Sequence, residues 1–494
     1  MKMKPRNPTP IVIGFEGTSL NQTLQQHLIK INPAGIVLFK RNIISLEQTR
    51  TLIHQIRDLL GQILVAVDHE GGMVNRFPEG CPVPPSSMGL GRINEKELLV
   101  DACRMQAELL AYLGINLNFA PVLDLATDER NPAIGTRAFS TRPDDIINYG
   151  RICMDSHRKL AIATTAKHFP GHGRSPADTH YSAGEVLVNY DKLWNEDLRP
   201  FRELINHGIP VVMPAHLIYP SLDSGIPAMF SRKIMTDLLR DKLGFQGLVI
   251  SDCVEMAAVS DSETPSSIAQ KGVFAGVDLF VSSFSLKKSL EFQLSLKEAL
   301  DRERQELPDD NRKSELTAER LHEFLDVYPG NPLNDKSLCR DSESVVQMHC
   351  RTIEMRRHKS LPEGYRNFFL LELSGDPNRG INADEQWGSV STGLLKTVES
   401  IRQHQIMSDC SIEIINDVIE KANLSHLTVV LITANGFRRK GFRRLLQQLE
   451  KADAVIHISL IDDRDVSGNL DNEWVTWGYN HWTAAALKRE LLSL

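Results

Sequence analysis

The segment Ala161-Ile162-Ala163-Thr164-Thr165-Ala166-Lys167-His168-Phe169-Pro170-Gly171-His172-Gly173 contains the pattern that decides the fold. Its first half is a run of small and β-branched residues, which is typical of a short buried strand. Its second half places a lysine and two histidines among one proline and two glycines, and this composition indicates a loop. We therefore predict a strand over 161–166 whose carboxyl end carries a chemically active loop that begins at Lys167.

The same pattern recurs from residue 11 to about residue 300. Each apolar run is followed by a polar or glycine-containing break and then by an amphipathic segment of helical length, such as Leu46–Leu60 or Asp101–Leu113. The eight apolar runs are Ile11–Phe15, Gly35–Phe39, Ile63–Val67, the first half of Ile115–Leu125, Ala161–Ala166, Val211–Met213, Leu248–Ile250 and Val277–Val281.

Strands that alternate with helices imply parallel pairing through crossovers, and eight such units match a closed (β/α)8 barrel of the TIM type. An open doubly wound sheet is the alternative. The barrel is favoured because polar residues repeatedly follow the apolar runs, as in Asp68-His69-Glu70, Lys167-His168 and Ser251-Asp252. A barrel gathers all eight strand ends around one site.

A smaller second domain is predicted after the barrel. The segment 301–334 is highly charged, and within it Leu316–Val327 is expected to form a closing helix that ends before Pro329-Gly330-Asn331-Pro332. We expect domains over 1–328 and 335–494, the latter an open α/β sheet with covering helices. Its expected strands are Phe368–Leu373, Ser411–Ile415, Thr428–Thr433 and Val455–Leu460, with a helix over Gly441–Lys451.

Composition narrows the class of protein. With 56 Lys and Arg against 63 Asp and Glu, the formal net charge is -7, which argues against a nucleic-acid partner. The 7 cysteines are scattered without close pairing, as in proteins of reducing compartments. We find neither a secretory signal nor a run of roughly 20 apolar residues for a membrane span. We therefore expect a cytoplasmic protein without a membrane partner.

Asp178 and His180 are the first candidate pair for catalysis. If their segment is extended, residues two apart point to the same side, and the carboxylate can orient the imidazole. A histidine held in this way can donate a proton and take it back, so the pair is an acid/base candidate. The alternative is that Asp178 caps a turn and His180 is a solvated loop residue.

Asp252 is the second candidate, because it ends an apolar strand. At the carboxyl end of a barrel strand an ionised carboxylate can serve as a nucleophile. The alternative is that Asp252 caps the following helix. The neighbouring Cys253 is interpreted as a small apolar packing residue.

Two further segments offer groups that could bind hydroxyls. Asp68 and Arg76 flank Gly71-Gly72, where the backbone can approach a ligand, although a tight turn alone would also explain the glycines. Arg137 ends the loop 131–137 and would otherwise be an exposed surface residue.

A metal-dependent barrel hydrolase is a rival interpretation. The possible ligands are His168, His172, Asp178, His180, His216 and Asp278. The sequence lacks an H-x-H pair after the first strand, an H-E-x-x-H motif and a cysteine pair, so we expect no metal or other cofactor.

Taken together, these residues resemble glycoside hydrolase family 3, in particular its bacterial β-N-acetylglucosaminidase branch. The resemblance covers roughly residues 10–290. The segments that carry it are Gly14–Thr18, Asp68–Gly72 with Arg76, Asn131–Arg137, Lys167–Gly173 with Asp178 and His180, Met213–His216, and Ser251-Asp252 with Met256.

The resemblance implies a role for each candidate. Asp252 would be the nucleophile and His180, paired with Asp178, the acid/base. The residues that would bind the terminal sugar are Asp68, Arg76, Arg137, Lys167 and His168. The implied activity is that of a retaining exo-β-N-acetylglucosaminidase acting on peptidoglycan fragments, with a small glycoside or muropeptide as its partner.

Two questions stay open within this resemblance. A family 3 β-glucosidase, a glycoside phosphorylase and a non-catalytic sugar-binding protein are the alternatives to the implied activity. Arg174 stands where a small or acidic residue is commoner in the family, and it is expected to favour an anionic aglycone.

Overall fold

The computed structural model describes residues 8–494 apart from several segments. These segments are 129–130, 132, 176–183, 307–312, 334–341, 358–359, 363–364, 374–393, 395–397, 399–400, 408–411, 434–441, 461–465, 468, 477–479 and 494. The chain divides into two compact units, the first comprising 1–70, 74–81 and 99–339 and the second 71–73, 82–98 and 340–494. The second unit thus includes two stretches that precede the expected linker, and the domain limits expected from the sequence stay predictions.

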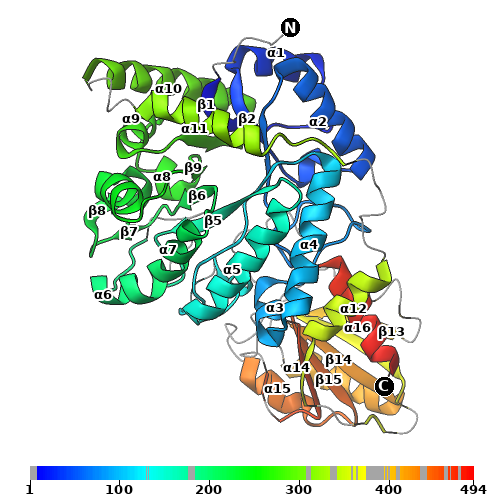
Figure 1. Ribbon diagram of the computed structural model, residues 1–494. Coiled ribbons are helices and arrows are strands. Elements are labelled where there is room, and N and C mark those ends of the chain that lie inside the picture. Colours follow the sequence, from blue (N-terminus) through cyan, green and yellow to red (C-terminus); the bar gives the residue numbers. More distant parts are fainter. Residues whose placement is uncertain are drawn as a thin grey trace. The chain divides into compact units, whose positions relative to one another are not determined.

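The first unit contains a closed barrel of eight parallel strands (Figure 1). In order around the barrel the strands are β1 (Thr9–Ile13), β2 (Pro33–Leu38), β3 (Leu64–Val67), β4 (Leu117–Asn118), β5 (Ala163–Phe169), β6 (Val211–Pro214), β9 (Leu248–Cys253) and β10 (Leu279–Ser282), and β10 pairs with β1. All eight apolar runs predicted from the sequence coincide with these strands. The predicted barrel is therefore confirmed, and the open sheet is wrong.

Helices follow the strands and lie outside them (Figure 1). The main ones are α1 (Gln22–Ile31), α2 (Leu46–Leu60), α4 (Lys96–Leu113), α5 (Pro143–Arg158), α7 (Leu198–Asn206), η5 (Lys233–Lys242, a π-helix), α9 (Pro265–Ala275) and α10 (Leu286–Glu306). Shorter elements are η1 (Lys40–Asn42), η2 (Gly135–Arg137), α6 (Tyr190–Lys192), η3 (Leu193–Asp197), β7 (Ile218–Tyr219), β8 (Asp223–Pro227), η4 (Ala228–Phe230) and α8 (Ala257–Ser260).

Helix α2 has the bounds expected from the sequence, and its signals explain why. The side chain of Ser45 accepts a hydrogen bond from the backbone N–H of Gln48 and so caps the amino terminus. Leu52, Ile53 and Ile56 lie three and four positions apart and are buried on one face. Gly61, at a φ of 77°, ends the helix in a conformation that favours glycine.

Helix α11 (Lys313–Val327) covers the amino-terminal end of the barrel strands. Its Leu321 and Phe324 are buried in the same cluster as the barrel core. Thr317 donates a hydrogen bond to Asp278, which directly precedes β10. The closing helix expected over Leu316–Val327 is therefore present, and it leaves the opposite end of the barrel for the loops that follow the strands.

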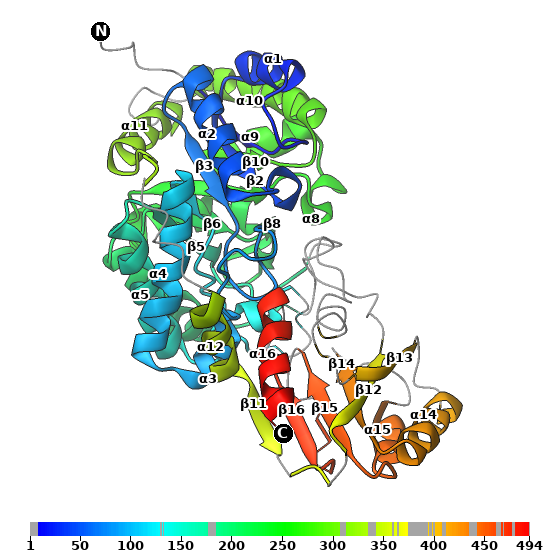
Figure 2. The same ribbon diagram turned by 90° about the vertical axis from the view of Figure 1, so that its right-hand side faces the viewer.

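The second unit contains a six-stranded sheet, seen in Figure 2. Its strand order is β11 (Glu354–Arg357), β16 (Asn472–Val475), β15 (Val455–Ser459), β14 (Leu427–Thr433), β12 (Asn367–Leu373) and β13 (Ile401–Met407). β11 is antiparallel to β16, and the other pairs are parallel. The helices are α3 (Ser87–Ile93), α12 (Ser342–Thr352), α14 (Ile412–Leu424), α15 (Phe442–Leu449) and α16 (His481–Ser493).

Strand residues of this sheet alternate between two cores, as the pleat of a strand requires. Val429 and Leu431 pack with residues of α14 and α15 on one face. Val430 and Ile432 pack with residues of α16 on the other. The predicted open α/β sheet with covering helices is confirmed.

The strand predicted over Ser411–Ile415 is wrong. Residues 412–424 form α14, and Ser411 lies outside the described residues. The β-branched run favours a strand over five residues, but Ile415, Val418, Ile419 and Ala422 are buried at helical spacing. The helical spacing decides the structure, because the helix buries one apolar face along its length.

None of the helices in the described part of the chain combines the length and apolarity needed to cross a bilayer. The cytoplasmic location expected from the sequence stays a prediction.

Candidate active site

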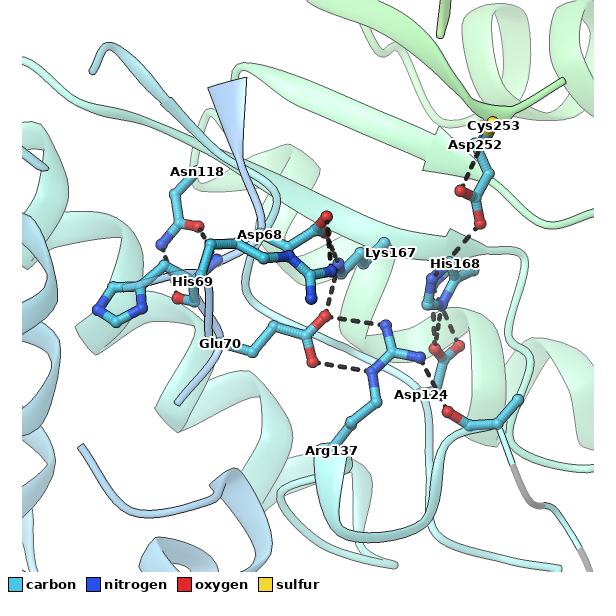
Figure 3. A network of polar contacts seen from close by, with 12 residues as sticks. Asp68, His69, Glu70, Asn118, Asp124, Arg137, Lys167, His168, Asp252 and Cys253 are labelled. Carbon is cyan, nitrogen blue, oxygen red and sulfur yellow. Dashed lines mark hydrogen bonds and ion pairs between the residues drawn. The ribbon is translucent and has the colours of Figure 1, made fainter. Parts of the chain in front are cut away.

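The carboxyl ends of β3, β5 and β9 bring the candidate residues together (Figure 3). Asp68 follows β3, Lys167 and His168 lie within β5, and Asp252 lies near the end of β9. Parallel strands of a barrel point their carboxyl ends to the same side, so residues far apart in sequence meet there.

Strand β5 runs three residues further than the sequence indicated, to Phe169. Lys167 and His168 belong to the strand and not to the loop after it. Successive side chains of a regular strand point to opposite faces, yet both of these side chains contact carboxylates of the site. The pairing of β5 with β6 shifts register between Lys167 and Phe169, and such an irregularity can bring neighbouring side chains to one face.

Lys167 is held between two carboxylates. Its Nζ lies 3.0 Å from Oδ1 of Asp68 and 2.6 Å from Oε1 of Glu70, and its side chain is buried. Asp68 also accepts a hydrogen bond from Nη2 of Arg76 at 3.3 Å. Arg137 donates to both oxygens of Glu70, each at 2.8 Å, in a bidentate pair.

This cluster carries two negative and three positive side chains, and it is therefore rich in hydrogen-bond donors. Burial opposes ionisation of Asp68, but the charges of Lys167 and Arg76 outweigh it, so the pKa of this carboxyl is lowered. For Glu70 burial is likewise outweighed by Arg137 and Lys167, and the pKa falls to about 2. Both carboxylates are charged at neutral pH, and the surplus of cationic donors suits a ligand with many hydroxyls.

His168 is oriented by a carboxylate that the sequence prediction missed. Its Nδ1 lies 2.7 Å from Oδ2 of the buried Asp124, which also accepts the backbone N–H groups of His168 and of His172. The charge of His168 outweighs burial and lowers the pKa of Asp124. The pairing turns the other nitrogen, Nε2, towards Asp252, whose Oδ2 is 4.0 Å away.

Glu70 and Asp124 are site residues that the sequence prediction missed, although the sequence contains a signal for each. Glu70 follows Asp68 by two positions at the end of a predicted strand, and that repeat of acids was a usable signal. Asp124 lies in the second half of Ile115–Leu125, an otherwise apolar run, where an acidic residue needs a buried partner.

Asp252 has the accessibility that a reacting group needs. Its side chain is 28% exposed, and its Oδ1 accepts the backbone N–H of Cys253 at 2.7 Å. The next helix, α8, is capped at Met256, so Asp252 is not its N-cap. Burial, followed by the charge of Glu255, raises the pKa of the Cys253 thiol to about 12, which agrees with its interpretation as a packing residue.

Comparison with known proteins decides the family. Residues 11–313 match the model of the glycosyl hydrolase family 3 N-terminal domain. The chain belongs to glycosyl hydrolase family 3. It is therefore a glycoside hydrolase, as the resemblance implied.

Two bacterial relatives match more than half of this chain. A beta-hexosaminidase of Hydrogenovibrio crunogenus is 38% identical over 279 residues, which are 54% of this chain and 77% of the relative. A beta-hexosaminidase of Nitrosomonas eutropha is 34% identical over 300 residues, which are 58% of this chain and 85% of the relative.

Two solved structures extend the comparison. A family 3 beta-N-acetylglucosaminidase from Paenibacillus has a TM-score of 0.85 at 23% identity, covering 100% of this chain and 97% of its own, and it shows the shared fold. NagZ from Neisseria gonorrhoeae is 30% identical with a TM-score of 0.56, and the match covers 70% of this chain and 96% of NagZ.

The acid/base pair that the sequence predicts for this family 3 enzyme lies outside the residues that the structure describes. Asp178 and His180 fall within 176–183. Their roles, and those assigned to the other site residues, stay predictions.

Arg174 lies just before that segment. Its guanidinium donates to both oxygens of Asp197 and pairs with Glu196. The preference for an anionic aglycone that is expected from this residue stays a prediction.

The ligands considered for a metal-dependent hydrolase do not all meet. Asp278 precedes β10 at the amino-terminal end of the barrel and is bound by Arg240 and Arg320. Nε2 of His216 lies 3.1 Å from the carbonyl oxygen of Cys253. Among the residues that the structure describes, which exclude Asp178 and His180, no group of three or more His, Cys, Asp and Glu side chains could hold a metal ion.

Proposed function

We propose that this family 3 enzyme is a retaining exo-β-N-acetylglucosaminidase, with Asp252 as its nucleophile. The observation that carries the proposal is the placement of Asp252, a partly exposed carboxylate beside a buried cluster of donors. A terminal sugar bound by Lys167, His168, Arg76, Arg137 and Asp68 would present its anomeric carbon to that carboxylate.

The choice of N-acetylglucosamine is supported by the relatives. Both bacterial proteins described above are named beta-hexosaminidases, and each matches more than half of this chain. NagZ, at 30% identity, has been solved in complex with N-trifluoroacetyl-D-glucosamine. We extend this preference to the present chain as a proposal.

The proposed reaction has two steps. A carboxylate oxygen of Asp252 attacks the anomeric carbon while the bond to the leaving oxygen breaks, and His180 gives that oxygen its proton. In the second step His180 takes a proton from water, and the resulting hydroxide displaces Asp252 and releases the sugar with its original configuration. Asp178 would orient the imidazole in both steps.

The natural substrates are proposed to be peptidoglycan fragments, small muropeptides that end in β-linked N-acetylglucosamine, in the cytoplasm. Hydrolysis is proposed over phosphorolysis and over activity on β-glucosides. The proposal needs no cofactor, because two side chains of the protein supply both the nucleophile and the proton.

Turnover of nitrophenyl β-N-acetylglucosaminide, β-glucoside and β-xyloside, each with and without phosphate, tests the proposal. We expect the N-acetylglucosaminide to be hydrolysed fastest and phosphate to leave the product unchanged. Preferential cleavage of the glucoside, or formation of a sugar phosphate, would contradict it.

A second measurement tests the acid role of His180. We expect His180→Ala to lose most turnover on natural glycosides, on the order of 10² to 10⁴-fold. It should lose much less on nitrophenyl glycosides, because a good leaving group needs no proton. An equal loss on both substrates would count against general acid catalysis by this residue.

A further inference from the structure

The main chain of His69 lies between the two carboxylates that hold Lys167. Asp68 precedes His69 and Glu70 follows it, and both carboxylates contact Nζ of Lys167. A rotation of the peptide units of His69 would move these carboxylates relative to Lys167. The position of this one backbone residue therefore controls the geometry of the sugar-binding cluster.

Side chains hold that backbone residue where the sheet no longer does. Nε2 of Gln106 donates to the carbonyl of His69 at 3.0 Å, and Asn118 binds both of its main-chain groups. β3 ends at Val67, and the last residue pair between β3 and β4 is Val67 with Asn118. Beyond that pair, Oδ1 of Asn118 accepts the N–H of His69 at 3.1 Å, and Nδ2 donates to its carbonyl at 3.0 Å. The amide thus makes the two hydrogen bonds that another strand residue would make, and Figure 3 shows Asn118 and His69 side by side.

The orientation of this amide is itself fixed. Nδ2 of Asn118 lies 3.2 Å from Nε2 of His157, whose Nδ1 lies 2.9 Å from the carbonyl oxygen of Cys153. Because a carbonyl only accepts, Nδ1 carries the imidazole proton and Nε2 accepts from Asn118. Both the amide and the imidazole are buried. A flipped amide would direct its oxygen at this acceptor, so one orientation is favoured.

We propose that Asn118 is a positioning residue of the active site. Through the main chain of His69 it sets where Asp68 and Glu70 lie, and through them it sets the position of Lys167. It acts without contacting the substrate. The inference rests on the proposed function insofar as these three groups bind the sugar.

Asn116, which directly precedes β4, provides a matched control. It is also buried, its Oδ1 accepts the N–H of Val65 at 2.7 Å, and its Nδ2 donates to the carbonyl of Ile63 at 3.1 Å. The side-chain amide of Asn116 thus holds the amino-terminal end of β3, where no candidate site residue lies. Replacing either asparagine removes a comparable set of buried hydrogen bonds, but only Asn118 is connected to the site.

Steady-state kinetics of Asn118→Ala and Asn116→Ala test the proposal. We expect kcat/KM of Asn118→Ala to fall on the order of 10²-fold, because a displacement of about 1 Å in a binding group has effects of that size. Asn116→Ala should lose similar thermal stability and keep kcat/KM within about twofold of the wild type. In an Asp68→Ala background, Asn118→Ala should cost about tenfold or less, because part of what it positions is already gone.

Equal losses of kcat/KM in Asn118→Ala and Asn116→Ala would overturn the proposal. A double variant of Asp68→Ala and Asn118→Ala whose loss of kcat/KM equals the product of the two single losses would also overturn it. If Asn118→Ala does not fold, Asn118→Asp and Asn116→Asp repeat the comparison, since aspartate still accepts the backbone N–H but cannot donate. The nitrophenyl glycoside that the wild type hydrolyses best is used throughout, so a wrong sugar assignment does not disturb the ratio.

Affinity for free N-acetylglucosamine, measured by calorimetry, is a readout independent of turnover. We expect it to be about tenfold weaker in Asn118→Ala and unchanged in Asn116→Ala. If the wild type binds the sugar but hydrolyses none of the glycosides, the proposed function fails, while this difference in affinity still decides the role of Asn118. Equal affinities of the two variants would count against that role.

Discussion

Asp252 and Asp278 lie on neighbouring strands of one barrel, and the barrel uses them in opposite ways. Asp278 precedes β10 and is buried among donors: Arg240 at 2.6 Å, Arg320 at 2.8 Å and Thr317 at 2.9 Å. Asp252 lies at the far end of β9, where its side chain is partly exposed and the imidazole of His168 is 4.0 Å away. One carboxylate is enclosed by partners, and the other is accessible to a substrate.

The difference follows from the direction of the strands. The amino-terminal end of the barrel is closed by α11, whose Thr317 and Arg320 reach Asp278, so this end contributes to stability. The carboxyl-terminal end carries the loops that follow the strands. Two aspartates that look alike in sequence, each next to an apolar run, thus acquire different surroundings from their ends of the strand.

The largest expected effect is that of Asp252→Asn. Asparagine keeps the shape of the side chain but cannot act as the nucleophile, so we expect kcat to fall on the order of 10⁴-fold or more. The unfolding temperature should stay close to that of the wild type, because the side chain is partly exposed. Turnover and a thermal melt on the same preparation check both statements. If Asp252→Asn kept activity within tenfold of the wild type, the nucleophile role proposed for Asp252 would be wrong.

Asp278→Ala should show the reverse pattern. It leaves the partly buried guanidinium groups of Arg240 and Arg320 without their carboxylate, so we expect a loss of about 3 kcal/mol in the free energy of unfolding. Activity per folded molecule should be retained. Denaturant unfolding measures the first quantity, and kinetics below the transition measure the second.

A milder variant separates the contribution of the two ion pairs of Asp278 from that of a single hydrogen bond. Thr317→Val removes one hydrogen bond to Asp278 and should cost about 1 kcal/mol. If Asp278→Ala cost no more than Thr317→Val, the structural role assigned to the amino-terminal end would be wrong.

The architecture was readable from the sequence because it rests on local signals. Each barrel strand is a short apolar run, so the number of strands could be predicted from the sequence. Each run ends where polar residues begin, and this pattern placed the candidate residues at the carboxyl ends of the strands. Where local signals compete, the prediction failed: residues 412–415 look like a strand until the helical spacing as far as Ala422 is included.

The partners within the site could not be read in this way. Glu70 pairs with Arg137, which is 67 positions away, and Asp124 pairs with His168, which is 44 positions away. Such pairs are set by closure of the barrel, which no local pattern encodes. The residue types were found at the strand ends, but which carboxylate holds which cation is a property of the folded chain.

His69 is an exception to the contrast between the two ends, and it gives the smallest effect. It lies at the functional end, yet its side chain is buried, and neither ring nitrogen has a hydrogen-bond partner among the described residues. Burial is the largest of the causes that lower its pKa from 6.5 to about 3. This imidazole thus resembles Asp278 in being enclosed and resembles Asp252 in its location.

The lowered pKa predicts how stability depends on pH. Between pH 6.5 and about 3 the unfolded chain binds a proton at this histidine and the folded chain does not. The contribution of His69 is therefore fully present above pH 6.5, and it is lost as the pH falls, by about 1.4 kcal/mol per unit at most. His69→Leu, which cannot take up a proton, should be destabilised less by acid than the wild type, as measured by denaturant unfolding from pH 8 to pH 5. The difference at pH 8 reports packing alone, so curves that stay parallel below pH 6 would show that His69 is protonated in the folded protein as well.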